Sequence, residues 1–527
     1  MLPVGDPRPC SGFGAMRSIR GTGVQGEWHM TDQPMRTVVI VGGGTAGWMA
    51  AAVLSKAFGS SLTIELVESD EIGIVGVGEA TIPQIRLINQ FLGLDENEFL
   101  RASQGSFKLG IQFNDWTRLG DSYLHAFGEI GLPIGLLGFH HYWLRASAEG
   151  LTEPYWAWSL NAQAAAGLRF DRLERIGQSP LGGIRYAFHF DAGLYARYLR
   201  SHSEARGVRR TEGRIVTVER REPDGDIAAV VLDGGRRIAG ELFLDCSGFR
   251  GLLIEGALAS GYDEWSHWLP CDRAIAVPSS RSETFRPYTQ ANARSAGWQW
   301  RIPLQHRTGN GHVYSSRHMS DDQAAAILLA NLDGEPLADP RPLRFVTGMR
   351  RRCWVGNCIA IGLASGFMEP LESTSIHLIQ SAIGRLLQLF PQRHIDPALR
   401  DEYNRQTRFE YERIRDFLIL HYKATERDDS EFWRACAAMP IPESLQRRID
   451  LFRADGRIQR DADELFTEGS WVQVLLGQGI VPKQHHPVAD AIDRTRLHEI
   501  LHASHALIAR TAQALPSHAE FVAGISA

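Results

Sequence analysis

The first clear hydrophobic segment of the chain is Arg36–Val41, whose β-branched apolar residues predict one buried strand. It runs into Gly42-Gly43-Gly44-Thr45-Ala46-Gly47, a match to G-x-G-x-x-G, and then into the apolar first turns of a helix at Trp48–Leu54. A second strand, Thr63–Val67, ends at Glu68. Such glycines permit the close approach of a pyrophosphate, the helix N-terminus stabilises its charge, and the terminal acid reaches a ribose hydroxyl. The unit predicts a dinucleotide site, for FAD or NAD alike.

Two later segments repeat the change from an apolar strand to a glycine turn. They are Leu242–Gly251 and Cys358–Ser365, and the second contains Gly362. Two strand-like stretches, Arg214–Val218 and Ala228–Leu232, precede them. This order is typical of a flavoprotein whose chain leaves the nucleotide domain for a substrate sheet and then returns.

A strand with alternating residues is expected in the middle of the chain. The segment Trp298-Gln299-Trp300-Arg301-Ile302-Pro303 fits W-x-W-x-I-P. Because successive side chains of a strand point to opposite faces, Trp298, Trp300 and Ile302 should share one face. The alternative is that both tryptophans are ordinary core residues under a sheet.

Helical spacing dominates from Pro397 onward, where apolar residues recur at about every 3.6 positions among many arginines and glutamates. An earlier helix is expected at Ile376–Phe390, with Ser373 or Thr374 as its N-cap. Free N–H groups at its start could hold an anion. Glu372, just before this helix, is by pattern alone an ordinary acid near a helix start.

Several single residues have two interpretations that the pattern leaves open. Lys108 stands between apolar residues and is either a surface lysine on a strand or a buried functional one. His125 and Phe127 belong to an aromatic stretch that is either core or ligand pocket. Trp471, in the apolar segment Gly469–Gly477, has the same two alternatives.

Composition excludes some classes of protein without choosing a function. A chain of 527 residues with 44% hydrophobic and 22% charged residues is typical of a globular protein of one to three domains. A net charge of −5 does not indicate a nucleic-acid surface. The six cysteines form no C-x-x-C pair, so we expect no metal site and reduced thiols, as in the cytoplasm. No apolar run approaches the length of about 18 residues that a membrane span needs. Residues 1–34 lack periodicity and are expected to be a disordered extension.

Four segments together resemble the flavin-dependent halogenases of the tryptophan-halogenase family. They are Gly42–Gly47, Phe107-Lys108, Trp298–Pro303 and Glu369-Pro370-Leu371-Glu372-Ser373-Thr374, and the resemblance extends from Met35 to His485. It implies an α/β fold with an FAD-binding Rossmann-type domain, like that of the GR2 flavin monooxygenases, a substrate-side β-sheet and a mainly helical C-terminal part. We therefore expect a discontinuous core over residues 35–396 and a helical substrate-pocket part over residues 397–527.

The resemblance also implies an activity and its partners. A separate NAD(P)H-dependent flavin reductase supplies FADH2, and oxygen and bound chloride or bromide then give hypohalous acid, which travels through a tunnel to a lysine. The cofactor residues carried over are those of the glycine turns and the acid of the second strand: Gly42, Gly44, Thr45, Ala46, Gly47, Glu68 and Gly362. We expect neither nucleic acid nor membrane as a partner, and the assembly is left open, with a homodimer as one alternative.

The family's reacting residues match two positions of this chain. Lys108 matches the lysine that hydrogen-bonds hypohalous acid or becomes a haloamine, and burial, which lowers a lysine pKa, suits the second role. Glu372 matches the glutamate that orients the electrophile or takes the proton from the ring. The family's halide-binding backbone amides match Thr374 and Ser375. The family commonly has glycine where this chain has Ser375, so the halide preference stays open.

The substrate residues are carried over in the same way. Trp298 and Trp300 resemble the pair between flavin and substrate, and His125 and Phe127 resemble the aromatic residues that enclose the substrate ring. Tryptophan-specific members have a tyrosine- and acid-rich clamp near the C-terminus. The matching segment Asp463–Gly479 has no tyrosine and offers Trp471 and aliphatic residues instead, which predicts a small aromatic substrate such as free indole rather than tryptophan.

Two other functions remain as alternatives at this point. A flavin-dependent aromatic hydroxylase would use NAD(P)H on the same chain and need no halide. A flavin-binding protein without oxygen chemistry would leave Lys108 and Glu372 incidental. The chain has no second G-x-G-x-x-G after a strand, which favours an external reductase.

Overall fold

A six-stranded sheet forms the nucleotide part of the molecule. The computed structural model describes residues 34–71, 78–222 and 224–526, so the extension expected at residues 1–34 lies almost entirely outside the described residues. In spatial order the strands are β20 (Trp354–Val355), β21 (Cys358–Ala360), β12 (Leu242–Asp245), β1 (Thr37–Val41), β2 (Thr63–Glu68) and β8 (Arg209–Glu212). The three predicted strand-to-glycine passages follow β1, β12 and β21, which lie side by side and parallel. Their carboxyl ends therefore meet at one edge of the sheet.

The central strands are buried because both faces of the sheet are covered. Val38 and Ile40 of β1 face a core shared with α1 (Thr45–Phe58), and α6 (Ala192–Glu204) and α8 (Ser375–Gln388) pack against α1. Val39 and Val41 face the other side, which is covered by a small antiparallel sheet of β9 (Ile215–Arg220), β10 (Ile227–Leu232) and β11 (Arg237–Ala239). The two stretches predicted before Leu242 thus form an antiparallel hairpin that covers this face of the nucleotide sheet.

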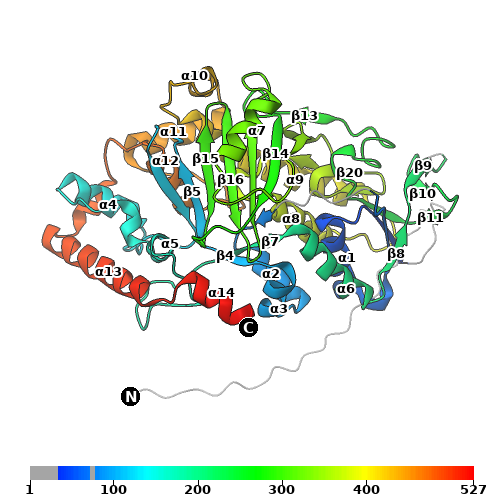
Figure 1. Cartoon of the computed structure of the whole chain (residues 1–527), viewed down its shortest axis with the longest axis horizontal. Helices are drawn as coiled ribbons and strands as arrows, with labels where there is room; N and C mark the ends of the chain where they lie inside the picture. Colours follow the sequence, from blue (N-terminus) through cyan, green and yellow to red (C-terminus); the bar gives the residue numbers. More distant parts are fainter. Residues whose placement is uncertain (1–33, 72–77, 223, 527) are drawn as a thin grey trace, which may run out of the picture.

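A seven-stranded sheet stands at the centre of the molecule (Figure 1). Its strands, in spatial order, are β18 (Arg341–Arg344), β14 (Arg273–Ser279), β17 (Thr308–Tyr314), β16 (Gly297–Pro303), β15 (Thr289–Arg294), β5 (Gly110–Asn114) and β6 (Ser122–Ala126). All neighbours are antiparallel except β15 and β5. The predicted tryptophan strand is β16, in the middle of this sheet, and both of its tryptophans are buried.

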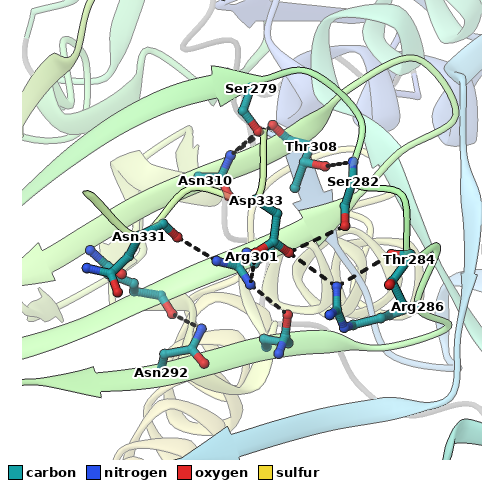
Figure 2. Close-up of polar contacts among 12 residues, drawn as sticks. Ser279, Ser282, Thr284, Arg286, Asn292, Arg301, Thr308, Asn310, Asn331 and Asp333 are labelled. Atoms are coloured by element: carbon teal, nitrogen blue, oxygen red, sulfur yellow. Dashed lines mark hydrogen bonds and ion pairs between the residues drawn. The ribbon is translucent and has the colours of Figure 1, made fainter. Parts of the chain in front are cut away.

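The two faces of β16 carry different kinds of side chain, as the alternating pattern predicts. Trp298, Trp300 and Ile302 are buried, and the ring of Trp300 lies over Gly311 of β17, where a Cβ would come within 2.0 Å of it. Arg301 points the other way. Its guanidinium pairs with Asp333 at 2.9 Å in the loop after α7 (Asp321–Ala330), as Figure 2 shows. This outer anchor holds the register that turns the tryptophans inward.

The remaining strands form two small sheets, and one of these links the six-stranded and seven-stranded sheets along the chain. The joining sheet has β7 (Ala187–Asp191) between β3 (Gly78–Ala80) and β4 (Ser106–Lys108), and β4 ends at Lys108. The other consists of β13 (Tyr262–Glu264), β19 (Gly348–Arg350) and β22 (Gly366–Phe367). Because Lys108 ends β4 and β5 starts at Gly110, the lysine lies where the joining sheet gives way to the large one.

The chain beyond residue 397 is helical, as predicted. Its helices are α9 (Pro397–Lys423), α10 (Glu431–Ala438), α11 (Glu443–Asp455), α12 (Glu468–Gly477), α13 (Arg494–Ala514) and α14 (His518–Ser526). The α12 helix packs on β6, whereas α13 packs on α5 (Leu160–Ala166) and α14 reaches α3 (Glu96–Ser103). In Figure 1 α14 lies at the foot of the molecule beside α2 (Ile85–Leu92) and α3, far from α10 and α11. The remaining described α-helix is α4 (Phe139–Ala148). No helix within the described ranges is long and apolar enough to cross a membrane.

Candidate active site

The predicted glycine turn between β1 and α1 requires glycine for steric reasons. Gly42 has φ +110°, and a Cβ there would lie 2.2 Å from the carbonyl oxygen of Cys246 on the neighbouring passage. A Cβ on Gly47 would lie 1.9 Å from the carbonyl oxygen of Gly42. Larger residues would force the two passages apart, so these glycines set how closely the turn and α1 pack.

Gly44 differs from its neighbours because it faces open space. A Cβ at Gly44 would meet no atom within 4 Å, although this residue is the N-cap of α1. No side chain caps the helix, so its first N–H groups point towards that space. On the far side, Gly362 has φ +70° and approaches Ala46 so closely that a Cβ would lie 3.0 Å away. The turn, with Thr45 starting the helix, fits the pyrophosphate of FAD.

Glu68 ends β2 against this turn. A Cβ on Gly43 would overlap the Glu68 carboxylate, so the acid lies beside the glycines as the motif predicts. The carboxylate is already held by Arg210, and Arg200 lies 3.8 Å away. Its expected bond to a ribose hydroxyl remains a prediction, since the same carboxylate oxygens would have to serve both partners.

Lys108 is fully buried at the end of β4. Its Nζ donates to the carbonyl oxygen of Thr81 at 2.9 Å and to Ser373 Oγ at 2.7 Å. The ring of Phe127 lies 5.2 Å from the nitrogen. Burial lowers the pKa of Lys108 to about 7, against the opposing charge of Glu372. The surface-lysine alternative is therefore wrong.

The strand that carries Lys108 is tied to the tryptophan strand. Ser106 Oγ donates to the carbonyl oxygen of Pro303, the last residue of β16, at 2.6 Å. The same hydroxyl contacts His189 Nδ1 at 3.0 Å, and His189 Nε2 contacts Thr289 Oγ1 at 2.9 Å. This network connects β4, β7, β15 and β16 and so relates the position of the amine to that of the tryptophans.

Glu372 lies between two imidazoles. Its Oε2 is 2.8 Å from His125 Nδ1, and its Oε1 is 2.8 Å from His421 Nε2, although the second contact lacks the alignment of a hydrogen bond. Burial alone would raise the pKa of Glu372, but His125 and His421 outweigh it and hold the pKa at about 2. The carboxylate is therefore ionised in a buried site, and the interpretation of Glu372 as an ordinary acid near a helix start is wrong.

Sequence reasoning missed His421. It lies near the end of α9, and its Nδ1 donates to the carbonyl oxygen of Phe417, one turn earlier, at 2.9 Å. That bond directs Nε2 towards Glu372. In the sequence His421 is one histidine on the apolar face of a long helix, and no motif distinguishes it.

The turn after Glu372 lacks the capping bond that the sequence predicts for the start of α8. Thr374 is the N-cap residue of α8, but its hydroxyl accepts no capping bond and has no partner, and Ser373 instead accepts from Lys108. Ser373 has φ +58°, a strained value for a residue other than glycine. Neither amide N–H of Thr374 or Ser375 donates to another described residue. The two N–H groups at the positive end of α8 are therefore available to an anion.

Trp298 is held by a second buried acid that sequence reasoning did not single out. Glu369 Oε2 accepts from Trp298 Nε1 at 2.7 Å and from Tyr422 Oη at 2.6 Å. Burial raises the pKa of Glu369 to about 7, and its other oxygen has no partner. The pKa values of the two glutamates, three residues apart, are thus shifted in opposite directions.

Trp471 of α12 packs against Phe417 with ring centroids 4.7 Å apart, and Arg448 lies 4.1 Å over its ring. The indole Nε1 is buried without a partner among the described residues. Two surface cavities, of about 410 and 380 Å³, are lined by neither Lys108 nor Glu372. Lys108, Glu372 and the two histidines beside the carboxylate are all buried, so the residues brought together here are enclosed by protein.

Comparison with known proteins identifies a family for this arrangement. Residues 37–494 match the family model for tryptophan halogenase. The tryptophan 7-halogenase RebH of Lentzea aerocolonigenes is 36% identical over 485 residues, which cover 85% of this chain and 91% of RebH. The tryptophan 6-halogenase SttH of Streptomyces toxytricini is 35% identical over 493 residues, 86% of this chain and 92% of SttH.

Solved structures agree with the sequence comparison. A flavin-dependent halogenase from Xanthomonas campestris has a TM-score of 0.91 at 52% identity, and the match covers 94% of this chain and 99% of that one. BrvH, a flavin-dependent halogenase from Brevundimonas sp. BAL3, has a TM-score of 0.90 at 48% identity with the same coverage. The chain therefore belongs to the tryptophan halogenase family and is a flavin-dependent halogenase, an oxidoreductase that uses oxygen, a halide ion and FADH2 from a separate reductase.

Proposed function

We propose that this halogenase acts on free indole or another electron-rich arene rather than on tryptophan. The supporting observation concerns the residues around α12. Tryptophan-specific members of the family are expected to have a clamp for the amino-acid part of tryptophan in this segment. Glu464, the buried acid just before α12, accepts from Arg448 at 2.6 Å. An acid already neutralised by a protein cation is not available to a substrate ammonium group. Trp471 and its buried aliphatic neighbours suit an apolar ring better.

Bound FAD supplies the oxygen chemistry that turns a halide ion into hypohalous acid. The chain's own contribution starts at α8, where the free N–H groups of Thr374 and Ser375 would hold the halide with the help of the helix dipole. Trp298, fixed by Glu369, and Trp300 would form the wall that keeps the arene away from the flavin. Only the small oxidised halogen species would then pass to the substrate.

Lys108 receives the halogen in this scheme. With a pKa of about 7, part of the amine is unprotonated at neutral pH and has a free electron pair. That pair attacks the halogen of hypohalous acid, the nitrogen–halogen bond forms, and the halogen–oxygen bond breaks. The hydroxide released takes a proton from the nitrogen and leaves as water. The haloamine would lie beside Phe127, which is expected to contact the substrate ring.

Glu372 completes the substitution. The arene carbon attacks the halogen, and the electron pair of the nitrogen–halogen bond stays on nitrogen. The carboxylate removes the ring proton, which restores the aromatic ring, and the proton is returned to the Lys108 nitrogen. His125 and His421 would keep the carboxylate ionised and aimed at the ring, as a general base requires.

One assay tests both the activity and the substrate. The enzyme is supplied with FAD, a flavin reductase, NADH, oxygen and bromide or chloride, and the products from indole and from tryptophan are identified by mass spectrometry. We expect halogenated indole, with kcat/KM on the order of tenfold above that for tryptophan. Lys108→Ala should lose the product while still binding FAD. Tighter binding of tryptophan than of indole, measured by calorimetry, would refute the substrate proposal.

We also assign the enzyme to the cytoplasm. The five cysteines within the described residues are buried and unpaired, and reduced thiols of this kind persist in that compartment.

A further inference from the structure

The C-terminal helix α14 lies beyond residues 37–494, which the family model matches, yet it reaches the strand of Lys108. Its first residue, His518, is fully buried. The ring accepts from the backbone N–H of Phe107 through Nε2 at 3.3 Å and contacts the carbonyl oxygen of Phe285 through Nδ1 at 3.0 Å. His518 therefore touches the residue directly before Lys108.

The segment before α14 is docked by the backbone as well as by side chains. The N–H of His518 donates to the carbonyl oxygen of Leu168 at 2.8 Å, and the N–H of Phe170 donates to that of Pro516 at 3.1 Å. At the other end of the helix, Arg101 Nη1 donates to the carbonyl oxygen of Ile525 at 3.0 Å. Three separate anchors thus fix α14, and its position does not depend on His518 alone.

Aromatic rings fill the space between α14 and β4. Phe107 stacks on Phe170 with centroids 3.9 Å apart, and Phe521 of α14 meets both rings edge-on at 5.5 and 5.0 Å. Because neighbouring side chains of a strand point to opposite faces, Phe107 faces α14 while Lys108 faces Ser373 and Glu372. The helix thus forms the rear support of the lysine.

The imidazole of His518 lies at the edge of β4 that no strand covers. Within the described residues β4 pairs with β7 alone, which leaves its other edge without a strand partner. Phe107 N–H points to this open edge and finds His518 instead of a carbonyl group. Burial lowers the pKa of His518 to about 4, with the charge of Arg281 acting in the same direction and the Phe285 carbonyl opposing it. The ring is therefore neutral at working pH and has one acceptor for Phe107 and one donor for Phe285.

We propose that His518 is a positioning residue for Lys108: by closing the open edge of β4 it holds the lysine nitrogen within hydrogen-bonding reach of Ser373 in a buried site. The proposal rests on the function proposed above only in giving Lys108 a catalytic role. The support itself comes from a segment outside the family match.

The test compares three variants of the full-length, FAD-loaded enzyme. His518→Phe keeps a ring that can stack on Phe285 but removes both hydrogen bonds. His518→Gln restores one acceptor and one donor on one planar group. His502→Phe, on an exposed position of α13, is the matched control. For each variant we would measure the melting temperature, kcat and KM for indole across pH, and the acetylation of Lys108 by acetic anhydride without turnover.

We expect His518→Phe to lower kcat on the order of 10- to 100-fold, because a displacement of about 1 Å at a reacting group has an effect of this size, with KM nearly unchanged. Water reaching Lys108 should move the midpoint of the pH profile upward, and at pH values above that midpoint the more accessible amine should be acetylated faster. His518→Gln should recover most of the activity, and the control should match the wild type.

Two outcomes would overturn the proposal. One is a His518→Phe enzyme with wild-type kcat, pH midpoint and Lys108 acetylation. The other is an equal loss in His518→Phe and His518→Gln together with a lower melting temperature, which would make the residue structural only. If the wild type forms no halogenated product, the proposed function fails, while faster acetylation of Lys108 in His518→Phe still supports the positioning role.

Discussion

Lys108 and Glu372 are equally buried but differ in what surrounds their charges. The lysine has neutral partners in Thr81 and Ser373, so desolvation dominates and lowers its pKa to about 7. The glutamate has an imidazole on each oxygen, so charge partners dominate and lower its pKa to about 2. One residue is therefore poised to lose a proton near neutral pH, while the other is ready to accept one.

The titration of Lys108 predicts the direction of the pH dependence. A haloamine forms only from the unprotonated amine, so kcat/KM should rise as the pH rises through about 7 and then level off. Lys108→Arg, whose guanidinium stays protonated, should be inactive across this range. Rate profiles with indole from pH 5 to about 9 would check this. Activity that falls through the same range would instead indicate that the ammonium form acts as a hydrogen-bond donor.

His421 is expected to matter through the protonation of Glu372. In His421→Phe the carboxylate loses one imidazole while staying buried, so its pKa should rise. We expect kcat to fall on the order of tenfold at low pH and to recover towards high pH. The ratio of variant to wild-type kcat cancels the titration of Lys108 and isolates this effect. A ratio that does not change with pH would mean that His421 only fills space.

At the scale of elements, the positions of the candidate binding groups depend on where helices start and where strands end. The first turn of α1 faces the open space at Gly44, and the first turn of α8 leaves two N–H groups free next to Glu372. The two helices pack against each other, so two helix starts that could bind an anion belong to one part of the molecule. The seven-stranded sheet contributes the two buried tryptophans of β16.

The start of α8 provides a prediction about halide choice. Ser375 brings a side chain to a position where the family commonly has glycine, next to the amide that would hold the halide. Ser375→Gly should enlarge this space and raise bromide over chloride incorporation by about twofold or more, at a helix cost of about 1 kcal/mol. Competition experiments with both halides, read by mass spectrometry, would measure the ratio. An unchanged ratio would show that Ser375 does not contact the ion.

The outer anchor of β16 predicts an effect on stability. Asp333 pairs with Arg301 at 2.9 Å and with Arg286 at 3.2 Å, and all three are partly buried (Figure 2). Asp333→Asn removes the negative charge that faces both arginines, so the free energy of unfolding should fall by about 1 kcal/mol. Urea unfolding would measure the loss, with Asp322→Asn on the adjacent helix α7 as the control. Equal stability of the two variants would contradict the anchor role.

At the scale of the whole molecule, the residues of the candidate site and their supports come from parts of the chain that are far apart. Lys108 and Ser373 are separated by 265 residues, and Phe107 and His518 by 411. The joining sheet β3–β7–β4 carries Phe107 and Lys108, and its strand β3 packs against β16 and β17 of the seven-stranded sheet. Among the helices beyond residue 397, α9 contributes His421 beside Glu372, α12 packs on β6, and α14 contacts Phe107 through His518. That this part forms a substrate pocket stays a prediction.

The sequence alone determined the features that depend on neighbours in the chain. The glycine turn, the parallel strands that follow the same pattern, the inward tryptophans of β16 and the helical C-terminal part all follow from local periodicity and backbone sterics. The family resemblance added Lys108 and Glu372 because their motifs are contiguous. Thr374, one of the two predicted N-cap residues, does occupy the N-cap of α8, but neither hydroxyl makes a capping bond, and that of Ser373 accepts from the distant Lys108 instead.

Only the tertiary structure decided which charges these residues have and what holds them in place. The imidazoles of His125 and His421 beside Glu372, the burial that raises the pKa of Glu369 and the contact of His518 with Phe107 all depend on packing between distant segments. A pKa depends on the desolvation and the neighbouring charges that packing creates, and neither can be read from the spacing of residues along the sequence. For this reason the sequence could name the lysine and the glutamate, while the fold determined the proton chemistry open to each.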